Sequence, residues 1–204
     1  MILNTTTWII IITIGASFYA WNRPEVYQKW ILNPYQIKLH RQYWRFITSG
    51  FVHLNYMHLF FNMFALFFFG QHVAYYFGPR GDILMLVLYI LGIIVSDIPT
   101  YIKYHNMPNY NSLGASGGVA AVVFSSIMFD PLNRIYIMFI PIGIPGFVLG
   151  ALYLVYSYYQ GKRMADNINH DAHLFGAIFG LIFTVLMRPG VVASFVEQIS
   201  NWSL

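Results

Sequence analysis

The chain of 204 residues contains no cysteine and few charged residues. Without cysteine, disulfide bonds, thiolate metal sites and a cysteine nucleophile are all excluded. Charged residues make up 9% of the chain, against about a quarter in average soluble domains. Hydrophobic residues make up 58%. A soluble fold could not bury so much apolar surface, so lipid is expected to be the solvent for most of this protein.

Several apolar runs approach the roughly 20 residues that a helix needs to cross a bilayer core. They do not alternate polar and apolar residues as barrel strands do, and a helix satisfies its own backbone hydrogen bonds in lipid. The pattern predicts one all-α membrane domain over residues 1–204, a bundle of six transmembrane helices without a separate soluble domain. The predicted spans are residues 7–21, 54–77, 83–102, 114–130, 146–159 and 172–187.

A long amphipathic connection, residues 22–50, joins the first two spans and is interrupted by Pro24 and Pro34. Five of the eleven Lys and Arg residues lie between Arg23 and Arg45, interleaved with Trp and Tyr. This mixture is typical of a segment at the lipid headgroups. We therefore interpret the net charge of +4 as contact with the bilayer rather than with nucleic acid. No cationic segment or cleavage site flanks the first span, which we interpret as a retained helix.

The fourth predicted span is short. About 15 residues at 1.5 Å each reach about 22 Å, less than a bilayer core of about 30 Å. Either the loop before it is therefore expected to dip into the membrane, or the helix lies below the membrane surface. Spans two, four and six run in the same direction, so residues near their starts lie at one depth. Polar side chains stand at those starts, namely His58, Asn62, Ser116 and His173.

Ser116 and His173 together have the chemistry of a nucleophile and its general base. Glycines at positions 114, 117 and 118 leave the approach to the Ser116 hydroxyl open. At 100° per residue, His173, Gly176 and Gly180 fall on one helix face, which can approach the fourth span closely. Each motif alone also fits ordinary packing of small residues between membrane helices. Their combination favours catalysis.

Acyl transfer also needs hydrogen-bond donors for the oxyanion. His58 and Asn62 are four residues apart on one helix face, and the backbone N–H groups near Ala115 and Ser116 can add to them. A structural hydrogen bond between helices is the alternative for Asn62, and a satisfied interfacial histidine is the alternative for His58. Asp171 is expected to point away from His173. No cofactor or metal site is expected, because no His-Glu-x-x-His string occurs.

In these residues the chain resembles the rhomboid family of intramembrane serine proteases along essentially its whole length. The family implies a Ser-His dyad without a third acid, an oxyanion hole that includes His58 and Asn62, and other transmembrane proteins as substrates. The matching residues are Trp44-Arg45, for which the family implies a structural role, His53, Met57-His58-Leu59, Asn62, Gly114-Ala115-Ser116-Gly117, Ala172-His173, Gly176 and Gly180.

One departure concerns the histidine. Many relatives place an aromatic residue four after the nucleophile, where it stacks on the catalytic imidazole, but here that residue is Ala120. We expect another side chain to hold His173, with the second span as a candidate source.

The resemblance also implies a multi-pass protein of a bacterial inner membrane, with the active site opening to the extracytoplasmic side. That orientation puts eight of the eleven Lys and Arg residues outside, against the positive-inside rule. We follow the resemblance, because the positive-inside rule holds for short loops and is a poor guide to the position of a long folded loop at the headgroups.

Two other functions compete with proteolysis. An inactive relative that binds membrane clients would be expected to have lost Ser116 or His173, and both are present. A small transporter with histidines as a proton relay would need no glycine-rich serine motif. Such transporters usually have broken helices or paired repeats, and the sequence indicates neither.

Overall fold

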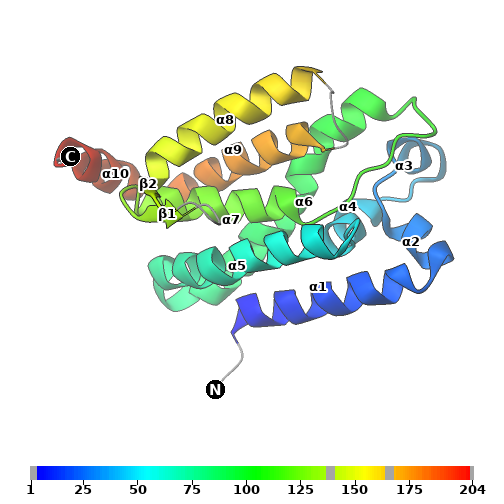
Figure 1. Cartoon of the computed structure of the whole chain (residues 1–204), viewed down its shortest axis with the longest axis horizontal. Helices are drawn as coiled ribbons and strands as arrows, with labels where there is room; N and C mark the ends of the chain where they lie inside the picture. Colours follow the sequence, from blue (N-terminus) through cyan, green and yellow to red (C-terminus); the bar gives the residue numbers. More distant parts are fainter. Residues whose placement is uncertain (1–3, 137–140, 164–167, 203–204) are drawn as a thin grey trace.

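The computed structural model describes residues 4–136, 141–163 and 168–202 (Figure 1). Each predicted span contains a helix whose ends lie close to the predicted ones, and long helices make up most of the fold. These helices are α1 (Thr5–Trp21), α5 (Tyr56–Phe77), α6 (Gly81–Tyr104), α7 (Ser116–Phe129), α8 (Gly146–Arg163) and α9 (His170–Met187).

Among the described residues, two helical stretches are long and apolar enough by themselves to cross a membrane. One is Tyr56–Tyr104, which comprises α5, the 3₁₀ turn η2 (Gly78–Arg80) and α6. The chain folds back at η2, where the Cα of Gly81 lies so close to the Ala74 carbonyl that a side chain would not fit. The other stretch is α9. The helices α1 and α7 are apolar but shorter.

The connection between α1 and α5 is a folded unit of short helices. It contains α2 (Pro24–Trp30), α3 (Pro34–His40), α4 (Arg45–Thr48) and the 3₁₀ turn η1 (Ser49–Phe51). Pro24 and Pro34 each occupy the first position of a helix, where a missing N–H costs nothing.

The buried Arg45 side chain holds this unit together, in line with the structural role that the resemblance implies. Its Nη1 donates to the carbonyl oxygens of Gln28 at 2.8 Å and Ile31 at 2.6 Å, and its Nε donates to Gln42 at 2.7 Å. Burial lowers the pKa of the Arg45 guanidinium below its usual range. An arginine nonetheless stays charged in a protein, so these carbonyls receive charge-assisted hydrogen bonds.

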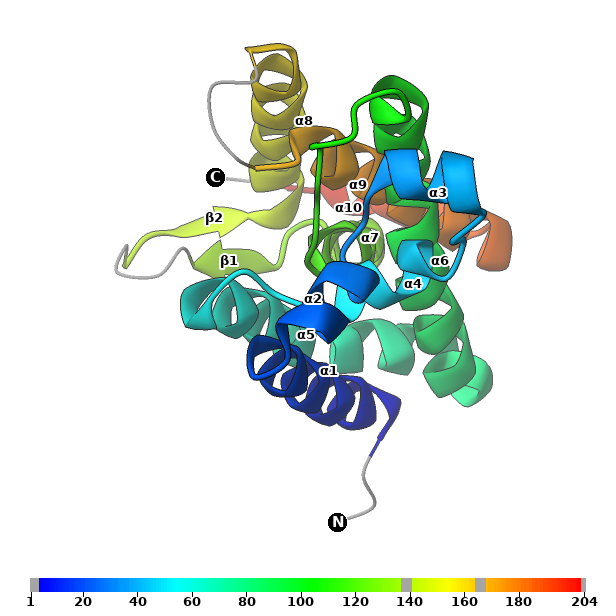
Figure 2. The same ribbon diagram turned by 90° about the vertical axis from the view of Figure 1, so that its right-hand side faces the viewer.

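Helix α7 lies at the centre of the bundle, with α5, α6 and α9 around it (Figure 2). Its 14 residues are nearly all buried, and they confirm the prediction of a short fourth helix. The extended segment before it is anchored on the α1–α5 connection. Leu32 and Ser112 exchange backbone hydrogen bonds of 2.9 and 3.0 Å, and Gly114 N–H donates to the Ser49 carbonyl at 2.9 Å.

Two features lie outside the six predicted helices, and one of them is not helical. The connection after α7 forms an antiparallel pair of short strands, β1 (Arg134–Tyr136) and β2 (Gly143–Pro145). Its prolines disfavour a helix, and pairing satisfies backbone groups that would otherwise be exposed. The chain after α9 forms a further helix, α10 (Val191–Ser200). Pro189 separates the two helices.

Candidate active site

Ser116 is the first residue of α7, directly after a turn that only glycine adopts readily. Gly114 has φ +116°, and the ring of His58 lies where a side chain at position 114 would stand. The start of a helix leaves backbone N–H groups without intrahelical partners. Within the described part of the chain, neither the Ser116 N–H nor its Oγ makes a hydrogen bond. Ser116 is half-buried, so a donor and a hydroxyl are both available at this helix start.

Close glycine contacts bring α9 onto α7, as the glycine face of residues 173, 176 and 180 predicted. A Cβ at Gly176 would fall on the carbonyl oxygen of Gly117, and a Cβ at Gly180 would fall on that of Ala121. At the same level the Ala172 carbonyl oxygen lies 3.5 Å from the position of a Cβ on Gly117. The neighbours of Ser116 and His173 in the sequence are therefore in contact.

The start of α9 is held by Asn169, which caps the helix. Its Oδ1 accepts the Ala172 N–H at 3.1 Å, and its Nδ2 donates to Thr100 Oγ1 of α6 at 2.9 Å and to Ser112 Oγ at 3.0 Å. Caps of this kind stabilise a helix by about 1 kcal/mol. Here the cap also ties α9 to α6 and to the segment that leads into Ser116, which restricts where His173 can lie.

His58 and Asn62 stand on α5 beside the same turn. Asn55 caps α5 by accepting the His58 N–H at 2.9 Å, and the His58 ring packs on Gly114. Asn62 is buried and donates one of its two N–H hydrogens to the His58 carbonyl at 2.9 Å. Both side chains therefore lie on the helix next to α7, and their oxyanion role remains a prediction.

The part of the chain from residue 40 to residue 190 matches the family model of the Rhomboid domain. This chain belongs to the rhomboid family.

Similar proteins come from a plant, an animal and a bacterium. RHOMBOID-like protein 12, mitochondrial, of Arabidopsis thaliana is 30% identical over 71% of this chain and 46% of its own length. Rhomboid-related protein 1 of Caenorhabditis elegans is 26% identical over 81% of the chain and 46% of its length. Rhomboid protease GlpG of Haemophilus influenzae is 30% identical over 69% of the chain and 67% of its length. The chain thus spans about half the length of the first two relatives.

His53 has a larger part in this rhomboid than its place in a loop predicted. It is fully buried, its Nε2 accepts the Ala115 N–H at 3.3 Å, and its Nδ1 shares a hydrogen bond of 3.0 Å with Ser17 Oγ of α1. Because Nε2 accepts, Nδ1 carries the proton of the neutral ring. The Ala115 N–H predicted for the oxyanion therefore already donates to His53, whereas the Ser116 N–H has no such partner among the described residues.

Asp171, the acid nearest to His173 in the sequence, faces α6. Its Oδ2 forms an ion pair with Lys103 Nζ at 3.0 Å. This partner is consistent with the prediction that Asp171 does not orient the histidine.

A second Ser-His-Asp group lies at the other end of α7. Ser126 Oγ and His72 Nδ1 share a hydrogen bond of 2.7 Å, and His72 Nε2 lies 3.9 Å from Asp130 Oδ2. Sequence reasoning missed this group because residue 72 is far from the other two in the sequence. Ser126 is 3% exposed and lies in the last turn of the helix. That end presents carbonyl oxygens and the negative end of the helix dipole, which disfavour an oxyanion.

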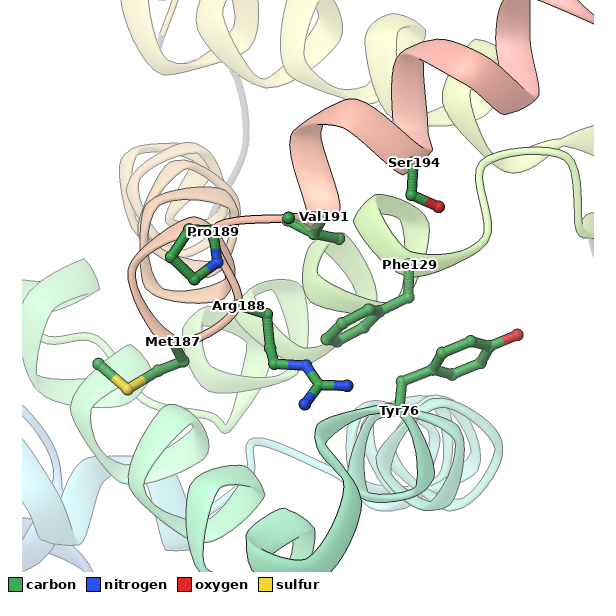
Figure 3. A pocket seen from close by; sticks show the side chains of 8 residues that line it. Tyr76, Phe129, Met187, Arg188, Pro189, Val191 and Ser194 are labelled. Atoms are coloured by element: carbon green, nitrogen blue, oxygen red, sulfur yellow. The ribbon is translucent and has the colours of Figure 1, made fainter.

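A surface cavity also lies at this end of the rhomboid, away from Ser116. It has a volume of about 450 Å³, and its lining includes Tyr76, Phe129, Arg188 and Ser194 (Figure 3). The Arg188 side chain extends into it, and it contains no histidine. In the described part of the chain, no group of three or more His, Asp or Glu residues could hold a metal ion.

Proposed function

We propose that this rhomboid is an intramembrane serine endopeptidase that cuts transmembrane proteins with a dyad of Ser116 and His173. The observation that carries the proposal is the contact of Gly176 with the Gly117 carbonyl. It joins the starts of α7 and α9, so the two helices present their first residues to the same region. Membership of a family that includes rhomboid protease GlpG adds support.

In the proposed reaction, Ser116 Oγ attacks the carbonyl carbon of the scissile peptide bond while His173 accepts the hydroxyl proton. His173 then gives this proton to the leaving amine, and the peptide bond breaks to leave an acyl group on Ser116. Water, deprotonated by His173, releases the acyl group. Contacts between nucleophile and base are often long in structures without a substrate. The free Ser116 hydroxyl of this structure is therefore compatible with the reaction.

The oxyanion of each tetrahedral intermediate would be stabilised by the Ser116 N–H, His58 and the second N–H of Asn62. The positive end of the α7 helix dipole also lies at Ser116, the first residue of that helix. Donors set in place before the reaction stabilise the developing charge without having to reorganise, and this is often the largest contribution to catalysis.

The finer membrane topology belongs to the same proposal. The chain is a membrane protein by its family, and we infer six spans formed by α1, α5, α6, α7, α8 and α9. With the family's orientation, the starts of α5, α7 and α9 face the extracytoplasmic side. An accessibility map in intact cells tests this inference, because labelling of residues 22–50 from the cytoplasm would reverse the orientation.

A fluorophosphonate probe on the purified protein in detergent tests the proposed nucleophile. We expect the probe to label Ser116, and Ser116→Ala to abolish both labelling and cleavage of a transmembrane reporter. Ser126→Ala is the matched control, since it removes the serine of the second Ser-His-Asp group and should leave both activities intact. Undiminished cleavage by Ser116→Ala, or a modified Ser126 in mass spectrometry, would overturn the assignment.

A further inference from the structure

Ala120 contributes only a methyl group to the helix turn that follows the proposed nucleophile. Ala120 lies one turn after Ser116 on α7 and is 6% exposed. It forms a buried cluster with Phe124 of α7 and Ala177 of α9. The Tyr153 ring of α8 packs against this cluster and lies 5.6 Å from the Phe124 ring. An aromatic ring from another helix thus packs against the cluster to which Ala120 belongs.

Glycine brings α8 close enough to α7 for this contact. A Cβ at Gly150 would lie 3.2 Å from Ile127 Cδ1 and 3.4 Å from Phe124 Cε1. Gly150 and Tyr153 are three residues apart and therefore lie on one face of α8. That face is turned toward α7 and α9, whereas Leu152 and Tyr159 on other faces of the helix are each 59% exposed.

The ring of Tyr153 lies nearly parallel to the imidazole of His173. Their centroids are 6.2 Å apart and the planes differ by 15°. The torsion that turns an imidazole about its Cβ–Cγ bond is broad and has no sharp staggered minimum. A flat neighbour on one face therefore limits the rotation of the ring. Rotation matters for a general base, because it turns the accepting nitrogen toward or away from the nucleophile.

We propose that Tyr153 of α8 is a positioning residue that holds the plane of the His173 imidazole. The inference rests on the proposed dyad. It identifies α8, and not the second span as the sequence suggested, as the element that supports the histidine. The flat ring supplies the support, and the phenol hydroxyl has no part in it.

Two variants at position 153 and a control at position 159 separate the effect of the ring from that of its bulk. Tyr153→Leu keeps apolar volume against Ala120 and Phe124 but removes the flat face, and we expect kcat to fall about 10- to 100-fold with little change in KM. Tyr153→Phe keeps the ring, and should restore kcat and its pH profile. Tyr159→Ala removes an exposed tyrosine from the same helix and should match the unmodified protein.

A double variant that moves the aromatic ring from α8 to α7 gives a second measurement. In the Ala120→Phe/Tyr153→Leu double variant the aromatic side chain comes from α7, and we expect a higher kcat than in Tyr153→Leu alone. Wild-type kcat in Tyr153→Leu, or a Tyr153→Phe variant as slow as Tyr153→Leu, would overturn the proposal. These outcomes are distinct from failure of the dyad, in which Ser116→Ala itself would still cleave the reporter.

Discussion

Adding one methyl group at Gly176 tests the contact on which the dyad depends. The Cβ of Gly176→Ala would fall on the Gly117 carbonyl oxygen and lie 2.9 Å from its carbon and 3.0 Å from its Cα. Ordinary contacts lie at 3.4–4 Å. The atoms in the way belong to the backbone of α7, and no flexible side chain can move aside. Relief therefore requires α9 to move away from α7.

The size of the effect follows from this overlap. Overpacking of a closed contact typically costs about 1–3 kcal/mol of stability. A displacement of α9 by about 1 Å would move His173 away from Ser116. Misplacement of a catalytic group on this scale can lower a reaction rate by about 10²-fold. We expect Gly176→Ala to remain folded with a lower unfolding temperature. Its labelling rate should fall by about 10²-fold.

The assay is the rate constant of fluorophosphonate labelling, measured in one detergent beside the thermal unfolding midpoint. Gly15→Ala on α1 is the control, because nothing lies within 4 Å of a Cβ there. Alanine is also favoured over glycine inside a helix, so this control should be at least as stable as the unmodified protein and label at the same rate. Wild-type labelling by Gly176→Ala would refute the reasoning that this contact brings the dyad together.

Three further substitutions test other parts of the site. Asn62→Ala should lower kcat by about 10²–10³-fold, as expected for loss of an oxyanion donor, while circular dichroism stays unchanged; unaltered kinetics would remove Asn62 from this role. His53→Ala leaves the buried Ala115 N–H without an acceptor and should cost about 1–3 kcal/mol in denaturant unfolding, so equal stability would contradict the described network. Arg45→Lys cannot reproduce the forked contacts of the guanidinium, and a thermal scan should find it less stable than Lys38→Arg, an exposed exchange in the same connection.

The positions of the main helices were largely predictable from the sequence. Apolar run length and helix breakers such as Gly78 and Pro131 are local properties, and they located the six helices, including the short α7, to within a few residues. The glycine face of α9 was predictable for the same reason, because helical periodicity alone brings residues 173, 176 and 180 together. Helix α10, residues 191–200, was not among the predicted spans.

The partners of the site residues depended on packing between distant segments. Tyr153 reaches His173 because Ala120 is small and Gly150 lets α8 approach, a combination that no single motif contains. His53 joins α1 to the start of α7, and His72 joins Ser126, across sequence separations that periodicity cannot describe. The sequence by itself determined the helices and the chemical types near their starts. Only the tertiary structure decided which hydrogen-bond donors, aromatic rings and backbone carbonyls of different helices are in contact. In a closely packed interior, each side chain contacts only the neighbours that the crossing of the helices brings next to it.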